Sequence, residues 1–278
     1  MNHIHWYPGH IAKAEKQLKE KLNLVDVVIE VVDARLPLSS EYPNIEKLIG
    51  NKPRLIVLNK SDLADEVFLN KWVDFLKEKN GFPVVKTNAS SGKDFSSIIN
   101  NVVKLGDPAV QKLVAKGLLP RAIRVMVVGM PNVGKSSIIN KLIRKPKAKT
   151  GAKAGVTRQQ QWVRVNEKID LLDTPGIIPL RQDNQICAYK LALVNSIGEN
   201  AYDSEFVAEF LLKNLNEKYK QRVMEYYKVE DELTLENVAK SRNWIVSNGE
   251  ADINRCAVYV LTDFRDGRLG RMTLDELP

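Results

Sequence analysis

The sequence is poor in cysteine and has no long apolar run. Its two cysteines, Cys187 and Cys256, lie far apart without metal-ligand spacing. Cys256 stands among apolar residues, so we expect it to be a buried structural thiol, and neither cysteine is a catalytic candidate. No apolar segment approaches the roughly 18 residues that span a membrane, and the first residues lack a basic segment followed by an apolar one. We therefore expect a cytoplasmic protein that does not associate with membranes.

Acidic residues are scarce in the first two thirds of the chain. Within the formal net charge of +8, residues 1–184 carry 30 Lys and Arg against 18 Asp and Glu, whereas residues 185–278 carry 12 against 16. The cations gather in two groups: Lys13, Lys16, Lys19 and Lys21, then Lys141, Arg144, Lys145, Lys147, Lys149 and Lys153. Such a patch favours a polyanionic partner such as nucleic acid, and a solvated lysine face is the alternative.

One stretch organises the chain, Gly129-Met-Pro-Asn-Val-Gly-Lys-Ser-Ser137. The β-branched run 123–128 before it predicts a buried strand, and apolar residues at helical spacing over 136–144 predict a helix after it. A strand, a Gly-x-x-x-x-Gly-Lys-Ser loop and a helix in this order indicate a phosphate-binding P-loop. Its N–H groups and helix dipole attract phosphate oxygens. The candidate nucleotide-binding residues here are Asn132, Val133, Gly134, Lys135, Ser136 and Ser137. Lys135 is also a catalytic candidate that binds the β and γ phosphates, and Ser136 is a candidate ligand of Mg²⁺.

A second informative stretch, Asn59-Lys60-Ser61-Asp62, follows the apolar run 53–58, which predicts a strand. The Asp62 carboxylate can accept two hydrogen bonds from guanine that adenine does not offer in that geometry. The Asn59 amide can contact the base edge, and the stem of Lys60 can lie along the ring. These residues are common in turns, so the tetrapeptide is weak evidence alone and strong evidence beside a P-loop.

Three further loops complete a candidate GTP site. Backbone N–H groups in the loop 87–92, at Asn88 and Ala89, are placed to contact the guanine oxygen. Thr157, at the end of the basic loop 145–158, is a candidate ligand of Mg²⁺ and a catalytic residue that contacts the γ phosphate. Asp173 follows a predicted strand and is a candidate for the Mg²⁺ shell, while the N–H of Gly176 can contact the γ phosphate.

The fold class that this pattern predicts is α/β, with a mostly parallel sheet between helices over residues 1–184 and an all-α C-terminal domain over 185–278. We expect strands at 25–32, 53–58, 82–86, 123–128, 160–166 and 168–172, and helices at 11–24, 44–49, 66–79, 93–105 and 136–144. Residues 106–120, with Pro108 and Pro120, are expected to form a connecting segment. Helical spacing continues at 186–197, 204–214, 216–227, 234–246 and 251–265.

The order of the motifs is unusual, because the base-contacting loops precede the P-loop and switch elements. Most GTPases have the P-loop first. The same sheet can be closed in either order, since domain termini commonly lie near one another and permit circular permutation. Permutation therefore ties the C-terminal domain that follows Gly176 directly to the segment that senses the γ phosphate.

On these motifs the chain resembles the circularly permuted GTPases of the ribosome biogenesis GTPase A family, also called YlqF-like. The stretches that carry the resemblance are 6–10 with 12–14, 33–37, 59–62, 129–137, 155–157, 173–177, 249–252 and 263–271. The resemblance implies a GTPase that binds the assembling large ribosomal subunit and its rRNA and promotes late maturation of that subunit. It implies GTP as substrate and Mg²⁺ as cofactor, and we expect a monomer.

The chain lacks the side chain that orients the attacking water in Ras-like enzymes. Ras-like enzymes place a glutamine after the Asp-x-x-Gly glycine, whereas this chain has Ile177, so we expect slow turnover by the isolated protein. His10 is our candidate for a catalytic group that the ribosome orders, and helix capping or RNA contact is the alternative. Asn132 is a candidate K⁺ ligand, because the loop resembles that of potassium-activated GTPases.

Two other functions stay open from the sequence. The first is a nucleotide-gated RNA-binding scaffold in which hydrolysis is incidental, and Ile177 keeps it possible. The second is an ATP-dependent kinase or ATPase, against which the stretch 59–62 argues. In the C-terminal region, Arg265, Arg268 and Arg271 are the candidate RNA contacts, and a purely structural helical domain is the alternative.

Overall fold

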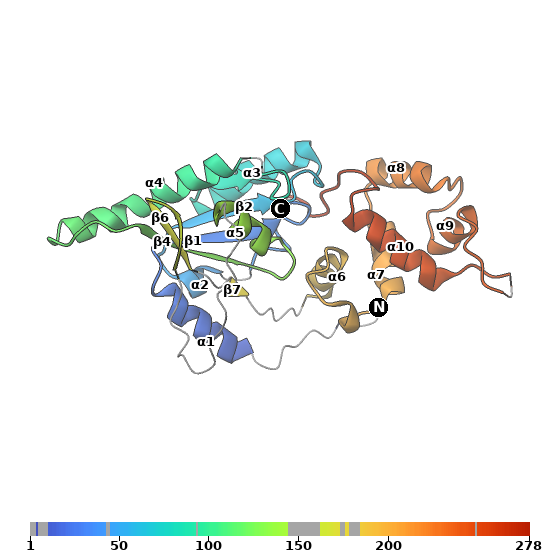
Figure 1. Cartoon of the computed structure of the whole chain (residues 1–278). Coiled ribbons are helices and arrows are strands. Elements are labelled where there is room, and N and C mark those ends of the chain that lie inside the picture. The colour runs from blue at the N-terminus through green and yellow to red at the C-terminus, as the bar shows by residue number, and fades with distance from the viewer. Residues whose placement is uncertain are drawn as a thin grey trace.

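The computed structural model describes residues 4, 11–42, 45–92, 94–143, 162–172, 176–177, 184–247 and 249–278, with backbone only at 11–15 and 176–177. A twisted sheet flanked by helices forms one part of the molecule, and a cluster of helices, α6 to α10, lies beyond one edge of it (Figure 1). The predicted fold class, an α/β P-loop domain followed by a helical region, is confirmed.

The sheet has seven strands in the order β3-β2-β1-β4-β6-β5, with β7 paired to β4 off this path. All pairs are parallel except β5 with β6. The strands are β1 (Val27–Asp33), β2 (Arg54–Asn59), β3 (Val84–Lys86), β4 (Ile123–Gly129), β5 (Trp162–Asn166), β6 (Ile169–Leu172) and β7 (Gly176–Ile177). Each predicted strand is therefore present, and the predicted hairpin is the antiparallel pair β5 and β6.

Helices cover both faces of the sheet, which is why its central strands read as continuous apolar runs. Successive side chains on a strand point to opposite faces. Val28 therefore packs with helices α1 (Ile11–Leu22) and α2 (Ile45–Ile49), while Ile29 packs with α4 (Phe95–Val114) and α5 (Lys135–Ile143). Helix α3 (Glu66–Asn80) packs on the same face as α1 and α2, where Trp72 is fully buried.

The C-terminal region is helical, as predicted, but two helices end earlier than expected. It contains α6 (Gln185–Leu193), η1 (Glu199–Ala201), α7 (Ser204–Lys213), α8 (Glu217–Tyr227), α9 (Leu235–Ser241) and α10 (Ile253–Arg265). Helix α9 stops before Trp244 because that ring stacks on Tyr259 and the chain folds back through a bridge between Ile245 and Ala251. Helix α6 likewise ends at Leu193 and not at 197.

Helix α4 corrects the expectation of a connecting segment after residue 105. It continues through Pro108 to Val114, a length of 20 residues. Proline removes one backbone donor and disfavours a helix interior. The helix nevertheless continues past this proline. Gly106 lies directly against Ile123 at the start of β4, so α4 and the sheet make close contact at this point.

The described residues contain no helix that is both long enough and apolar enough to cross a membrane. Cys256 is fully buried within the helical region, as expected. Cys187, on α6, is only partly covered, and its thiol lies 3.5 Å from the backbone oxygen of Ser39.

The contact at Gly106 predicts a specific loss of stability. A Cβ at this position would lie 2.3 Å from Cγ2 of Ile123, so Gly106→Ala forces the helix or the strand to move. We expect Gly106→Ala to lower the free energy of unfolding by about 1–3 kcal/mol, the usual cost of overpacking. Gly198→Ala is the matched control, because nothing lies within 4 Å of its Cβ and its φ is −66°. Urea denaturation of both variants tests this, and equal stabilities would contradict the packing argument.

Candidate nucleotide site

Three loops that sequence analysis singled out meet at one edge of the sheet. They are the loop 59–62 after β2, the loop 87–92 after β3 and the P-loop after β4. Strands β1, β2 and β4 run parallel, with Asp33 beside Asn59 and Val31 beside Gly129. Their carboxyl ends therefore lie together, and ligands of open α/β sheets bind at that edge. The P-loop follows β4 and enters α5 at Lys135, as predicted.

The side-chain amide of Asn59 connects all three loops. Its Nδ2 donates to the backbone oxygen of Val133 in the P-loop at 2.8 Å, and its Oδ1 accepts from the N–H of Ala89 at 3.1 Å. Asn59 itself is almost completely buried. The amide thus holds the P-loop and the loop 87–92 together, a role distinct from the base contact that the sequence suggested.

Gly134 leaves the space that this connection needs. Its backbone φ of +100° is one that residues with a Cβ rarely adopt. A Cβ at this position would also lie 2.1 Å from Nδ2 of Asn59. The second glycine of the P-loop is therefore required by both its backbone conformation and its contact with Asn59.

Lys135 is folded into the P-loop. Its ammonium group donates a hydrogen bond to the backbone oxygen of Met130, and the residue is 7% exposed. Burial lowers the pKa of Lys135 to about 8. Ser136 and Ser137, by contrast, are exposed at the first turn of α5, where a helix N-terminus favours anions.

Lys60 belongs to a buried ionic cluster that the sequence analysis missed. The ammonium of Lys60 and the guanidinium of Arg35 both contact the Asp33 carboxylate, at 2.9 Å each, and Asp33 is fully buried. These two cations hold the pKa of Asp33 well below its usual range, although burial alone opposes this. Arg35 also reaches the backbone oxygens of Phe264 and Arg265 at the end of α10. The sequence pattern that could have predicted this cluster is Asp33 at the end of a strand with Arg35 two residues later.

Asp62 and Asn88 occupy different environments at the site. Asp62 is exposed and forms no hydrogen bond or ion pair with any residue that the structure describes, so its carboxylate faces solvent. The Asn88 side chain accepts from the N–H groups of Ser90 and Ser91, which fixes the turn of its own loop. The Ala89 N–H is already bonded to Asn59.

The P-loop is also attached to the helical region. Asn132 adopts a left-handed φ of 57°, and its Nδ2 donates to the backbone oxygen of Asn195 at 2.6 Å. The Ser196 hydroxyl donates to the backbone oxygen of Pro131 at 2.7 Å. The segment that follows α6 therefore fixes two successive residues of the phosphate loop.

The C-terminal tail, residues 272–275, returns to the loop after β1. The backbone N–H of Leu274 donates to the backbone oxygen of Arg35 at 2.9 Å. The buried Asp275 carboxylate accepts from the N–H groups of Leu38 and Ser39 at 2.9 and 2.7 Å. The helical region is thus bonded to the sheet domain on both sides of the candidate site.

Several candidate residues lie outside the described part of the chain: His10, Thr157 and Asp173. Of the second switch segment only the backbone of β7 is described, where Gly176 lies beside Val128 of β4. Of the predicted basic patch, Lys16 and Lys19 are exposed on α1 and Lys141 on α5. Residues 144–153 and the side chain of Lys13 are likewise not described.

The three arginines proposed as RNA contacts have protein partners. The Arg265 guanidinium bonds to the backbone oxygens of Ala192 and Leu193 and to Tyr202, and so closes the end of α6. Arg268 pairs with Asp263 at 2.9 Å. Arg271 is more than half exposed. Arg265 therefore has a structural role, and Arg271 is the most accessible of the three.

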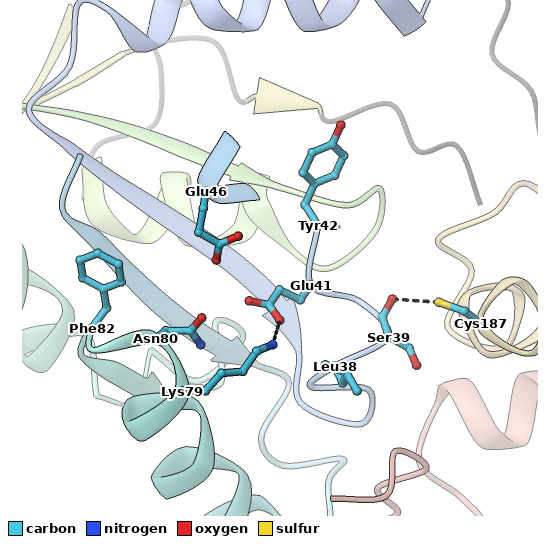
Figure 2. Close-up of a pocket in the computed structure, with 9 residues that line it drawn as sticks. All are labelled: Leu38, Ser39, Glu41, Tyr42, Glu46, Lys79, Asn80, Phe82 and Cys187. Carbon is cyan, nitrogen blue, oxygen red and sulfur yellow. Dashed lines mark hydrogen bonds and ion pairs between the residues drawn. The ribbon is translucent and has the colours of Figure 1, made fainter. Parts of the chain in front are cut away.

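A separate open cleft of about 550 Å³ lies between the loop after β1 and the end of α3 (Figure 2). Its charged groups are already paired: Lys79 contacts Glu41 at 3.2 Å, and Arg54 beneath it contacts Glu46 at 3.2 Å. None of the predicted nucleotide-binding residues lines it. Its lining residues are Leu38, Ser39, Glu41, Tyr42, Glu46, Lys79, Asn80, Phe82 and Cys187.

No cluster of three or more His, Cys, Asp or Glu side chains suited to a metal ion occurs among the described residues. The exposed hydroxyl of Ser136 at the start of α5 is the candidate metal ligand that the structure does describe. A single hydroxyl beside phosphates suits Mg²⁺, which keeps several waters and is held by few protein groups together with substrate phosphates.

Comparisons with known proteins agree on one family. The family model described as "50S ribosome-binding GTPase" matches residues 124–239, beginning in the strand before the P-loop. Ribosome biogenesis GTPase A of Bacillus cereus is 43% identical over 277 residues, which cover 98% of this chain and 93% of that protein.

Two solved structures are similar over most of the chain. A GDP-bound YlqF structure has a TM-score of 0.68 and 29% identity and covers 94% of this chain and 98% of its own. A GNP-bound YlqF structure from T. maritima has a TM-score of 0.67 and 28% identity, with coverage of 95% and 98%.

The buried ionic cluster predicts a difference between two aspartates beside the same loop. Asp33→Asn leaves Arg35 and Lys60 without their shared carboxylate, so we expect the free energy of unfolding at pH 7 to fall by about 3–5 kcal/mol. Asp62→Asn is the matched control, with an expected change within about 0.5 kcal/mol, because Asp62 is exposed.

Acid should remove the same stabilisation from the unaltered protein. Because the pKa of Asp33 is lowered in the folded state, its contribution is present above the unfolded-state pKa of about 3.9 and is lost as pH falls below it. Denaturation curves measured at pH 7 and at about pH 3 test this. The difference in free energy of unfolding between Asp33→Asn and the original protein should be smaller at about pH 3 than at pH 7. A gap independent of pH would contradict the ionic argument.

Proposed function

The chain belongs to the ribosome biogenesis GTPase A family, and we propose that it hydrolyses GTP to GDP and phosphate when bound to the assembling large ribosomal subunit. In this proposal it promotes late maturation of the subunit and acts as a cytoplasmic monomer. The names of its relatives support the ribosomal role, since ribosome biogenesis GTPase A of B. cereus is 43% identical over 98% of this chain. The division into a GTPase domain, residues 1–184, and an rRNA-contacting helical domain, residues 185–278, is part of the same proposal.

The proposal is carried by the hydrogen bonds of the Asn59 side-chain amide, which join the candidate guanine-binding loops to the P-loop. Its bonds to Val133 and Ala89 bring the base-contacting and phosphate-binding stretches to one edge of the sheet, although 70 residues separate Asn59 from Gly129 in the chain. A guanine nucleotide needs both stretches at once. An ATPase has no need of the Asp62 carboxylate at this edge.

The nucleotide roles follow from the environments of the loop residues. The exposed Asp62 carboxylate accepts from the guanine N–H groups, while Lys60, held by Asp33, lies along the base. Asn88 and Ala89 shape the loop that faces the guanine oxygen. The phosphates lie on the N–H groups of the P-loop, and Lys135 exchanges its bond to Met130 for the β and γ phosphates. Residues Asn132, Val133, Gly134, Ser136, Ser137 and Gly176 complete the GTP-binding set.

Magnesium and water activation involve residues beyond the described part of the chain. Ser136, Thr157 and Asp173 are the proposed Mg²⁺ ligands, and Mg²⁺ supplies neutralisation of the charge that develops on the phosphates. Ile177 has no polar side chain to orient water. We assign that role to His10, which the ribosomal partner brings into the site, with Thr157 contacting the γ phosphate.

Turnover with and without ribosomal subunits tests the reaction. We expect slow GTP hydrolysis by the protein alone and a large rise when purified large ribosomal subunits are added. His10→Ala should lower the stimulated rate by about 10²-fold or more, in the range that acid–base or water-orienting groups contribute, while subunit binding is retained.

His5→Ala is the matched control, since it removes a nearby imidazole, and it should leave the stimulated rate unchanged. Undiminished stimulated turnover in His10→Ala would exclude His10 as the activating group. No stimulation of the original protein, with GTP-dependent subunit binding intact, would favour the alternative of an RNA-binding scaffold with incidental hydrolysis.

Potassium dependence tests the role of Asn132. The Asn195 oxygen holds the Asn132 amide through its Nδ2, which leaves Oδ1 as the atom to contact a monovalent cation beside the phosphates. We expect faster turnover in potassium than in sodium salts at equal ionic strength, and loss of that difference in Asn132→Ala. Asn140→Ala, an exposed asparagine of α5, is the control. Equal rates in the two salts would rule out the cation site.

A further inference from the structure

Helix α4 is longer than the sheet domain requires. Its 20 residues span about 30 Å, whereas the seven residues of β4 span about 23 Å. Its buried residues end at Gly106, and Val110 is the last that packs against the core. The remainder extends past the sheet at the end of the molecule away from α6 (Figure 1). We call residues 111–120, the free end of the helix and the turn after it, the α4 arm.

The α4 arm exposes apolar side chains that the fold does not use. Nine of its ten residues are exposed, Leu113 being the exception. Val114 is 43% exposed, Leu118 56% and Leu119 89%. Single exposed apolar residues are ordinary, but three of them at the tip of a projecting element indicate a contact surface.

The tip of the arm is an ordered turn. Gly117 takes a left-handed φ of +76°, its N–H donates to the oxygen of Val114 at 2.9 Å, and the N–H of Leu118 donates to the oxygen of Leu113 at 3.1 Å. This is the bonding of a glycine-terminated helix end. The two leucines are therefore presented by a fixed backbone, which lowers the entropy that a partner must offset on binding.

The charged residues of the α4 arm are all basic. Residues 108–124 contain four cations and no acidic residue. Two of the cations are used within the fold, since Arg121 pairs with Asp26 at 2.6 Å and Arg124 lies over the Trp162 ring. The other two, Lys112 and Lys116, are exposed and form no ion pair with the residues that the structure describes. Lys112 lies in the last turn of α4, where a cation is favourable, and Lys116 lies in the turn after the helix.

We propose that the α4 arm is a docking surface for RNA of the ribosomal subunit, a surface additional to the nucleotide-dependent site. Lys112 and Lys116 neutralise backbone phosphates, and Leu118 and Leu119 pack against sugar and base surfaces, as apolar side chains do when inserted between bases. RNA fits better than a protein, because lysine is depleted at protein interfaces and the arm has none of the aromatic, Met or Arg residues enriched there. This inference rests on the proposed ribosomal function.

The position of the arm gives it a distinct role. It joins the amino end of β4, whereas the P-loop follows the carboxyl end, so the length of β4, about 23 Å, separates them. Binding through the arm is therefore independent of which nucleotide is present. The arm anchors the protein on RNA, and the nucleotide loops add the GTP-dependent contacts.

Charge reversal tests the anchor. The double variant Lys112→Glu/Lys116→Glu should bind purified large ribosomal subunits at least about tenfold more weakly, by the same factor with GDP and with a non-hydrolysable GTP analogue. The slope of log affinity against log salt should become shallower by about 1.5–2, the value of two phosphate contacts. Turnover without subunits should be unchanged. Lys71→Glu/Lys77→Glu is the control, with the same charge change at exposed positions of α3.

The outcomes separate this inference from the proposed function. If the original protein does not bind subunits, the proposed function fails. If it binds and the arm variant binds equally well, or only as weakly as the α3 control, the arm proposal fails alone. Lys112 and Lys77 both lie in the last turn of their helices, so thermal unfolding of the arm variant should match that of the α3 control.

Cross-linking identifies the occupant. With Leu119 replaced by the photo-reactive residue p-benzoylphenylalanine, irradiation of the complex with large subunits should give a product that ribonuclease degrades. A product that keeps its size after ribonuclease treatment would show a protein as the partner and overturn the RNA assignment. Absence of any cross-link, with binding intact, would also overturn it.

Discussion

The hydrogen bonds of the Asn59 amide are the constraint on which the candidate site depends. Circular permutation places the base-contacting half of this GTPase domain before the phosphate-binding half, so the order of the chain alone does not hold the two together. Pairing of β1 with β4 brings the strand ends side by side, and Asn59 then joins the loops that leave them. The glycine at position 134 follows from this, because any Cβ there would occupy the space of the amide.

Two buried ionic clusters near the same sheet show how pairing decides the behaviour of a buried acid. Asp33 has two cations to itself, and they lower its pKa. Glu30 has only Arg54, which also contacts Glu41 and Glu46, and burial raises the pKa of Glu30 to about 7. In the first cluster two cations outweigh the cost of burial and fix Lys60, whereas in the second the effect of burial outweighs that of the single, shared cation.

Most of the fold was predictable from sequence because local periodicity and the P-loop motif agree in this chain. The strands around the P-loop, the hairpin and the helical nature of the C-terminal region were correctly predicted. The course of α4 was not, because Pro108 signals a break, and the packing of Gly106 on Ile123 and of Val110 on the core involves residues distant in the sequence. In the site, motif spacing located Asn59 and Lys60 but not their partners. Those partners, Val133 and Asp33, are set by sheet register, which no local pattern specifies.

The helical region is bonded to the sheet domain at several places, namely after α6, at α8, at the end of α10 and at the C-terminal tail. Ser196 bonds the P-loop side, and Leu274 and Asp275 bond the loop after β1. Because these bonds come from several elements, the helices cannot shift as one body without straining the hydrogen bonds that hold the P-loop and the loop after β1. A partner that binds the helical region is therefore linked to both loops of the candidate site. By thermodynamic reciprocity, any factor by which such a partner changes the affinity for nucleotide is the factor by which nucleotide changes the affinity for the partner.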